Sequence, residues 1–253
     1  MPTYAQPTKP LEGYLKIVEL FETVQGEGRY VGVPSVFLRT GMCNLECAGC
    51  DTKWDRWSET LYASVVQLVL GWKANHLVLT GGEPTLWQKQ LGEFLDVLDT
   101  TNPNGNSHVV TVETNGAVPL RDAAFTSRVD LFSFSPKVGS LGREEKFSWQ
   151  VVFENLYNTR GKNQLKYVLD PANVEDMNRI LQFHREIEHV TPDEVVYFQP
   201  YDTETLVNIQ HAPGLDDVVQ YLRRLTALTQ VVTERSEGRF RVLPQLHKLL
   251  SWR

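Results

Sequence analysis

The sequence predicts an α/β fold built on a mostly parallel sheet, and two observations support this prediction. Short runs rich in β-branched and aromatic residues alternate with stretches whose apolar residues recur at helical spacing, from Leu15 almost to the end. The chain has 253 residues and no linker-like segment longer than its first fourteen. We therefore expect a single domain, with residues 1–14 as an N-terminal extension and residues 15–253 as the core.

Eight segments are expected to form strands, and four apolar stripes between them are expected to form helices. The strands are LKIVEL (15–20), SVFLR (35–39), HLVLT (76–80), HVVTVE (108–113), LFSFS (131–135), QLKYVL (164–169), EVVYFQ (194–199) and FRVL (240–243). The apolar stripes run over residues 61–72, 91–98, 180–187 and 215–225. In such βα alternation the chemistry gathers at the C-terminal ends of the strands, whether the sheet is open or closed as a barrel.

Composition and charge exclude several classes of protein. Hydrophobic residues make up 42% of the chain and charged residues 22%, as in ordinary globular domains. The net charge of 25 minus 31, or −6, argues against a broad nucleic-acid-binding surface. No apolar run approaches the ~18 residues that span a bilayer, and the N-terminus lacks the pattern of a secretory signal. We expect a cytoplasmic protein without a membrane or direct nucleic-acid partner.

All three cysteines of the chain, Cys43, Cys47 and Cys50, lie within eight residues. Cytosolic thiols stay reduced, so a cluster of this kind indicates metal ligands or catalytic thiols rather than a disulfide framework. Structural zinc takes four ligands, whereas three thiolates on a four-iron cluster leave one iron with an open position. The C-x3-C-x2-C spacing allows a short loop to wrap one such cluster. A zinc site completed by a histidine is the alternative.

Polar residues follow several of the expected strands. LVLTGGEPTL (77–86), VETNG (112–116), FSPK (134–137) and YFQP (197–200) each place carboxylate, amide, hydroxyl or ammonium groups at a C-terminal strand end. The paired glycines leave backbone groups open to close approach. Each segment taken alone is also consistent with a turn or a cap.

The cysteine spacing resembles that of the radical S-adenosylmethionine enzymes. This resemblance implies a [4Fe-4S] cluster on Cys43, Cys47 and Cys50, with S-adenosylmethionine chelated to the open iron. It also implies that the strand-end segments bind this cofactor, through Thr80, Gly81, Gly82, Glu83, Glu113, Asn115, Ser135, Lys137 and Gln199.

A narrower resemblance covers the chain from about Val18 to His247. TVQGEG, an arginine closing the next strand, C-x3-C-x2-C-D-T, GGEP, ETNG, SPK and RVLPQLHKLL are together similar to the motifs of the 7-carboxy-7-deazaguanine synthases. The resemblance implies a partial (β/α) barrel that converts 6-carboxytetrahydropterin into 7-carboxy-7-deazaguanine with loss of ammonia, on the route to the deazaguanine bases of tRNA. It further implies a homodimer and an external one-electron donor such as flavodoxin or ferredoxin.

The substrate of that family is a flat heterocycle with one carboxylate, so its pocket requires a cation and hydrogen-bonding groups. Arg39 is expected to bind the carboxylate, and Gln25, Glu27 and His247 the heterocycle. Thr52 is expected to offer an oxygen to Mg²⁺. The alternatives are a surface ion pair for Arg39, a structural role for His247 and a turn closed by Thr52. No residue is assigned as a general acid or base.

Two other functions fit parts of the sequence. One is a different radical S-adenosylmethionine enzyme, such as an activase that makes a glycyl radical on a partner protein. The other is a zinc module without catalytic activity. The motifs leave residues 200–214 unassigned, including His211, and the SWR that follows the QLHK motif makes the terminal carboxylate of Arg253 a doubtful substrate ligand.

Overall fold

The computed structural model describes residues 13–48, 50, 52–103, 105, 107–137, 139, 141, 147–187, 195–201, 214–235 and 240–250. Most of the expected N-terminal extension, His211 with most of the 200–214 segment, and Arg253 lie outside the described residues. The division into an extension and a core therefore stays a prediction.

A nine-stranded sheet forms the centre of the molecule, in the order β3-β1-β2-β4-β5-β6-β7-β8-β9. Strand β1 (Tyr14–Val24) is antiparallel to β2 and to the short strand β3 (Ser58–Leu61). The other seven strands are parallel, each to the next: β2 (Pro34–Thr40), β4 (His76–Gly81), β5 (Val109–Thr114), β6 (Leu131–Phe134), β7 (Asn163–Leu169), β8 (Val196–Pro200) and β9 (Phe240–Val242). Because β3 and β9 are the two edges, the sheet is open, which confirms the predicted partial barrel.

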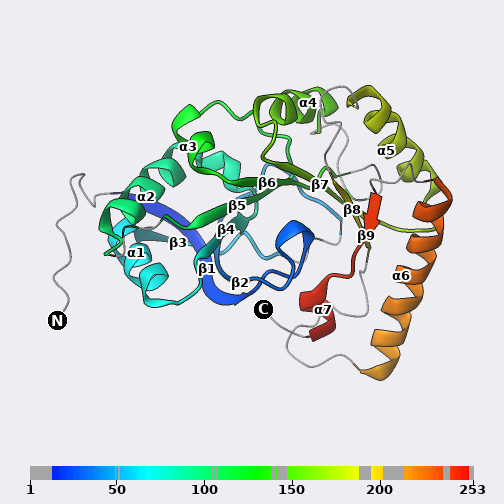
Figure 1. The fold of residues 1–253 in the computed structure, drawn as a ribbon, viewed down its shortest axis with the longest axis horizontal. Helices are drawn as coiled ribbons and strands as arrows, with labels where there is room; N and C mark the ends of the chain where they lie inside the picture. The colour runs from blue at the N-terminus through cyan, green and yellow to red at the C-terminus, as the bar shows by residue number, and fades with distance from the viewer. Residues whose placement is uncertain are drawn as a thin grey trace.

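Helices cover the convex side of this curved sheet (Figure 1). They are α1 (Tyr62–Gly71), α2 (Gln88–Thr101), α3 (Ala123–Arg128), α4 (Trp149–Asn158), α5 (Val174–Ile187) and α6 (Leu215–Arg235). Two short helices, η1 (Gly28–Tyr30) and α7 (Leu246–Leu250), lie on the concave side instead, and η2 (Pro84–Trp87) leads from β4 into α2. The Leu246 amide donates to the Gly26 carbonyl at 3.1 Å, so the segments before η1 and at the start of α7 are neighbours although they come from opposite ends of the chain.

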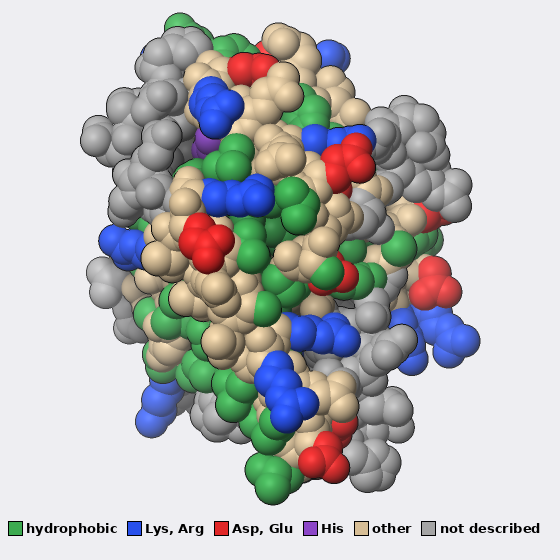
Figure 2. Space-filling view, turned by 90° about the vertical axis from the view of Figure 1, so that its right-hand side faces the viewer, with side chains coloured by type: hydrophobic (Ala, Val, Ile, Leu, Met, Phe, Trp, Pro, Cys, Tyr) green, Lys and Arg blue, Asp and Glu red, His purple; other side chains and the backbone are tan. Residues whose placement is uncertain are grey.

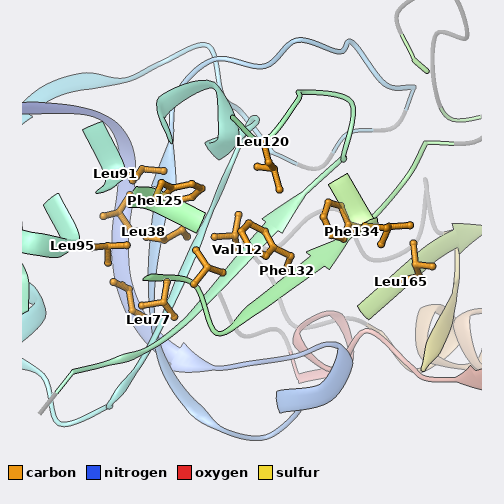
Figure 3. Close-up of a cluster of buried hydrophobic side chains, with 14 of the residues drawn as sticks. Leu38, Leu77, Leu91, Leu95, Val112, Leu120, Phe125, Phe132, Phe134 and Leu165 are labelled. Atoms are coloured by element: carbon orange, nitrogen blue, oxygen red, sulfur yellow. The ribbon is translucent and has the colours of Figure 1, made fainter. Parts of the chain in front are cut away.

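The core lies between the sheet and these helices. Figure 3 shows Leu38, Leu77 and Val112 of the sheet packed against Leu91 of α2 and Phe125 of α3, and all five side chains are buried. Because successive strand residues point to opposite faces, the residues between these apolar ones face the concave side. Many of them are polar, although strands in a parallel sheet covered on both sides are usually apolar throughout. The concave side is therefore the place for the chemistry.

A buried histidine links three strands on the concave side of the sheet. Ser35 and Thr111 contact the two ring nitrogens of His76 at 2.6 and 2.8 Å, and the ring of Tyr30 lies 4.8 Å away. Burial lowers the pKa of His76 to about 4. The histidine is therefore neutral near pH 7 and joins the N-terminal ends of three strands without adding charge.

The expected strands are present, and all four expected helices are found. Among the described residues the strand ends lie within about two residues of the expected ones, except that β1 extends to Val24, four residues beyond its expected end. Strand β3 and helices α3, α4 and α7 were not predicted. β3 has four largely exposed residues, and α3 and α7 are too short for a periodic apolar pattern. In α4 the buried side includes Asn155, whose amide bonds the backbone at Gly116, Val118 and Leu120, so its apolar stripe is interrupted.

None of the described helices is long and apolar enough to cross a membrane. Figure 2 shows the side of the molecule that carries α6, where basic and acidic side chains are interspersed among apolar ones. The described charged side chains of this face are thus of both signs.

Removing a core ring should destabilise the fold without touching the concave side. Phe94 of α2 is fully buried, and its ring lies 6.2 Å from that of Tyr62 on α1. We expect Phe94→Ala to lower the free energy of unfolding by roughly 3 to 5 kcal/mol, measured by urea unfolding followed by circular dichroism. Leu68→Ala on the exposed side of α1 is the control and should change it by less than about 0.5 kcal/mol. Equal losses in the two variants would contradict this packing.

Candidate active site

The carboxylate of Glu113, on β5, joins three segments on the concave side. Thr80 of β4 donates to its Oε2 at 3.1 Å, and Gln25, which follows β1, donates to its Oε1 at 3.2 Å. The sequence predicted Thr80 and Glu113 for the cofactor and Gln25 for the substrate. The structure brings residues of these two predicted sets into direct contact.

Glu27 is the second carboxylate at this place and is more deeply buried. Its Oε2 forms an ion pair with Lys166 of β7, and its Oε1 accepts a hydrogen bond from the side chain of Gln245 at 2.9 Å. His247 Nδ1 lies 3.9 Å from the same Oε1. Burial alone would raise the pKa of Glu27, but the charge of Lys166, with smaller contributions from His247 and the hydrogen bonds, lowers it to about 2. Glu27 is therefore ionised throughout the physiological range.

Lys166 connects the two carboxylates. Its Nζ is 3.9 Å from Glu113 Oε1 as well as paired with Glu27, and only 8% of its side chain is exposed. The sequence analysis missed this residue. The sequence does contain a signal for Lys166, because it is the lone lysine of QLKYVL, a strand that the βα pattern places inside a parallel sheet.

The C-terminal segment closes over the loop that contains Glu27. A Cβ atom at Gly26 would lie 2.8 Å from His247 Nδ1, so the absence of a side chain at Gly26 allows His247 to come this close. Gln245 is held in the same segment by the Tyr221 hydroxyl, which accepts from its backbone amide at 2.6 Å. The expected arrival of His247 from the far end of the chain is thus seen, and Gln245, from the same motif, is a further residue that the sequence analysis missed.

The cysteine loop follows β2. The Leu45 amide donates to the Cys43 thiol at 3.4 Å, and the Cys50 amide donates to the Cys47 carbonyl at 3.4 Å. Burial raises the pKa of the Cys43 thiol to about 11, and it also raises the pKa of Cys47, where the charge of Lys137 acts in the opposite direction. Cys43 and Cys47 must therefore each lose a proton when they bind a metal.

Three thiols in one short loop suit the chemistry of an iron–sulfur cluster. Among the described residues no three His, Cys, Asp or Glu side chains converge on one metal position. The thiolates of a four-iron cluster each bind a different iron and need not converge. The charge of Cys50 contributes to raising the pKa values of Cys43 and Cys47, so the three thiols lie near one another.

The GGEP segment packs against the start of the cysteine loop. A Cβ at Gly81 would lie 2.3 Å from the Thr40 carbonyl oxygen, and one at Gly82 would lie 2.0 Å from that of Met42. These glycines thus allow other backbone segments of the same chain to come close to them. Glu83 is fully buried and accepts hydrogen bonds from the amides of Thr85 and Asn115 and from the hydroxyls of Thr85 and Thr114. Its carboxylate orders this loop, and a role as cofactor ligand stays a prediction.

The remaining predicted cofactor residues line the next strand ends. Asn115 donates to the side chain of Asn44, next to Cys43, at 2.9 Å. Lys137 donates to the Ser135 hydroxyl at 3.1 Å and is near enough to Cys47 to affect its pKa. The ends of β5 and β6 therefore border the cysteine loop, as the prediction requires.

Gln199 of β8 has an unusual environment. It is fully buried, and neither its side-chain oxygen nor its side-chain nitrogen has a hydrogen-bond partner among the described residues. Its neighbour Phe198 is in the core, so Gln199 faces the concave side. An unpaired buried amide is unfavourable by roughly 1 to 3 kcal/mol, which a polar ligand would relieve. Gln199 thus fits the predicted site for a polar cofactor.

Arg39, at the end of β2, lies beside the cysteine loop. Its Nε donates to Glu19 of β1 at 2.7 Å, and its Nη1 donates to the Thr52 hydroxyl at 3.1 Å. The residue predicted to bind the substrate carboxylate and the residue predicted to bind Mg²⁺ are therefore neighbours. The ion pair that was the alternative for Arg39 is also present.

Comparison with known proteins agrees with this geometry. No family model matches the chain. It is 31% identical over 205 residues to the 7-carboxy-7-deazaguanine synthase of Rhodopirellula baltica, covering 75% of this chain and 74% of the relative. The chain belongs to the 7-carboxy-7-deazaguanine synthase family. The synthase of Haemophilus influenzae is 27% identical over 242 residues, covering 94% of both chains.

Solved structures show the same fold. The crystal structure of QueE from Escherichia coli superimposes with a TM-score of 0.61 at 22% identity, over 92% of this chain and 95% of that one. Native anSMEcpe with bound AdoMet and the Kp18Cys peptide superimposes with a TM-score of 0.54 at 17% identity, over 83% of this chain and 63% of that one. The partial-barrel fold expected for the 7-carboxy-7-deazaguanine synthase family is thus confirmed.

The buried ion pair gives a testable dependence of stability on pH. The pKa of Glu27 is 4.5 in its ordinary state and about 2 in the folded protein, so its ionisation favours folding above pH 4.5, and this contribution is lost as the pH falls toward 2. Lys166→Met should leave a buried carboxylate without its cation and lower the free energy of unfolding at pH 7 by roughly 3 to 5 kcal/mol.

The measurement is urea unfolding of the parent and the variants between pH 7 and pH 3. The Glu27→Gln, Lys166→Met double variant removes both charges, so it should be more stable at pH 7 than Lys166→Met alone. A Lys166→Met protein as stable as the parent at pH 7 would show that the pair is not needed to hold these strands together.

Proposed function

We propose that this chain converts 6-carboxy-5,6,7,8-tetrahydropterin into 7-carboxy-7-deazaguanine with release of ammonia, as a radical lyase of deazapurine biosynthesis of the queuosine type. Membership of the 7-carboxy-7-deazaguanine synthase family is the observation that supports this most directly. The concave side supports it too, since the cysteine loop borders a cluster of ionised and hydrogen-bonding groups at the strand ends.

Two cofactors fit the residues present. Cys43, Cys47 and Cys50 would hold a [4Fe-4S] cluster, and the strand ends at Glu113, Asn115, Ser135, Lys137 and Gln199, with the Thr80–Glu83 loop, would hold S-adenosylmethionine. When bound, the cluster and S-adenosylmethionine together supply the carbon radical that removes a hydrogen atom too weakly acidic for a side-chain base. The bound AdoMet of anSMEcpe, which shares the fold, supports this assignment.

The side chains then bind and orient the substrate. Arg39 offers a charge-assisted hydrogen bond to its carboxylate. Glu27 stays ionised beside Gln25 and His247, so this group of residues presents both acceptors and donors to the edge of the heterocycle. Lys166 and Gln245 keep the Glu27 carboxylate in one orientation.

Thr52 is proposed as a ligand of Mg²⁺. This ion prefers octahedral oxygen coordination and keeps several waters, so one hydroxyl together with substrate oxygens is sufficient. Arg39 donates a hydrogen bond to the Thr52 oxygen, which therefore lies next to the guanidinium that would bind the substrate carboxylate. Metal and substrate would then bind cooperatively.

The proposal includes partners. The substrate is a small pterin, and a one-electron donor such as flavodoxin or ferredoxin is required to reduce the cluster. We further propose a cytoplasmic homodimer without direct nucleic-acid contact.

The decisive experiment is anaerobic reconstitution with iron and sulfide, followed by absorption and electron paramagnetic resonance spectroscopy and an assay with the carboxylated pterin. We expect a four-iron cluster and formation of 7-carboxy-7-deazaguanine. A cluster and S-adenosylmethionine cleavage with no turnover of the pterin would favour another radical enzyme, such as a glycyl-radical activase. A colourless protein with one zinc ion would refute both readings.

Replacing Gln199 should separate stability from cofactor binding. Gln199→Leu removes two buried polar atoms that have no hydrogen-bond partner in the described part of the chain, so the cofactor-free protein should unfold at the same or a higher temperature than the parent. Its dissociation constant for S-adenosylmethionine, measured by equilibrium dialysis, should rise roughly threefold to tenfold because a hydrogen bond is lost. Gln182→Leu, on the exposed side of α5, is the matched control. Unchanged cofactor binding in Gln199→Leu would remove this residue from the site.

Replacing Thr52 should remove the response to magnesium. We expect turnover of the parent to rise when Mg²⁺ is added, and Thr52→Ala to lose this rise while keeping its iron content and its affinity for S-adenosylmethionine. Thr52→Ser retains the oxygen and should keep the response. The measurement is the initial rate as a function of Mg²⁺ concentration, and a full response in Thr52→Ala would assign the hydroxyl to the loop alone.

A further inference from the structure

Strand β1 has a bulge opposite the end of β2. In the antiparallel register Ile17 pairs with Thr40, but the next pair is Glu19 with Arg39, so Val18 is an extra residue. A bulge of this kind changes which face of the sheet the following side chains occupy. The bulge therefore lies immediately before the residue that pairs with Arg39.

The side chains on either side of the bulge show what it changes. Before it, Leu15 and Ile17 belong to the core, and after it Leu20 packs against the same core. Strict alternation from Ile17 would have placed Glu19 toward the core and Leu20 on the concave side. With the bulge, Glu19 instead lies on the concave side, directly opposite Arg39.

Glu19 is one of three contacts that fix the Arg39 side chain. The Nε of Arg39 donates to Glu19 Oε1 at 2.7 Å, its Nη1 donates to Thr52 at 3.1 Å, and its guanidinium carbon lies 5.8 Å from the centre of the Phe21 ring. Phe21 is itself stacked on Phe37, with ring centres 5.3 Å apart. These contacts leave Nη2 without a hydrogen bond to any described residue.

We propose that Glu19 is a positioning residue for the reaction, which holds the guanidinium of Arg39 so that its Nη atoms face Thr52 and the substrate carboxylate. The inference depends on the proposed function, because it assumes that Arg39 binds a carboxylate. A bidentate guanidinium contact requires a fixed plane, and a carboxylate on Nε fixes this plane while leaving the far edge of the fork for the ligand.

The competing explanation is an ordinary surface ion pair. Exposed pairs of this type contribute little to stability, and the side chains of Arg39 and Glu19 are 22% and 38% exposed. A gain in stability from this ion pair therefore does not explain why the hydrogen-bond ladder between β1 and β2 is interrupted here. Orientation of Arg39 does explain the bulge, because bulges next to functional sites commonly change the direction in which side chains point.

The test compares Glu19→Gln, Glu19→Asp and Arg39→Lys, alone and as the Glu19→Gln, Arg39→Lys double variant. Glu59→Gln, an exposed carboxylate on the neighbouring strand β3, is the matched control. Dissociation constants for 6-carboxytetrahydropterin are measured by anaerobic equilibrium dialysis of the reconstituted protein without reductant, so that no turnover occurs. Iron content, affinity for S-adenosylmethionine and the unfolding midpoint are measured for each variant.

We expect Glu19→Gln to raise the dissociation constant for the pterin about tenfold, with iron content, affinity for S-adenosylmethionine and unfolding midpoint unchanged. Glu19→Asp should recover part of the loss. In the Arg39→Lys background, where no Nε–H donor remains, Glu19→Gln should add less than a twofold effect.

Parent-like pterin binding by a folded Glu19→Gln protein would overturn the inference, and so would losses that multiply in the double variant. Failure of the proposed function looks different, because the parent protein itself would then neither bind nor convert the pterin.

Discussion

The ammonium of Lys166 between the carboxylates of Glu27 and Glu113 is the constraint on which the concave side depends. Removing a lysine and a carboxylate from water costs several kcal/mol per ion, and their attraction offsets this only with good geometry and further hydrogen bonds. Gln25, Thr80 and Gln245 supply those bonds. The network therefore specifies the arrangement of three strands and two loops more than it adds to stability.

Because the sheet is open, its interior has room for chain segments that complete this network. A closed barrel fills its interior with layers of strand side chains, whereas here the interior receives the loop of residues 25–33 and the segment of residues 245–247. The loop is fixed on β7 by Arg29, and the segment is fixed on the loop by the hydrogen bond from Gln245 to Glu27, which spans 218 positions of the chain. The site is therefore complete only when both ends of the chain have folded onto the sheet.

Much of the fold and of the candidate site was predictable, because strand-forming runs alternate regularly with helical apolar patterns along the chain. Short runs of β-branched and aromatic residues identified the strands, and the C-terminal strand ends led to Glu113, Asn115 and Ser135. Lys166 and Gln245 were missed because their roles come from partners more than a hundred residues away. The orientation of Glu19 was not predictable, because a bulge reverses the alternation on which such predictions depend.

Several features of the site are unfavourable for a protein that binds nothing. Gln199 is buried with polar atoms that form no hydrogen bond to a described residue, Glu83 is a buried carboxylate whose pKa is raised by desolvation, and Met42 has a φ of 70° directly before Cys43. The strained backbone of Met42 is held from both sides, since its amide donates to Trp54 and its carbonyl accepts from Glu83. The surrounding hydrogen bonds thus hold this backbone conformation in place. A ligand that enters such a preformed site loses less free energy to ordering the protein, so the cost in stability becomes a gain in affinity.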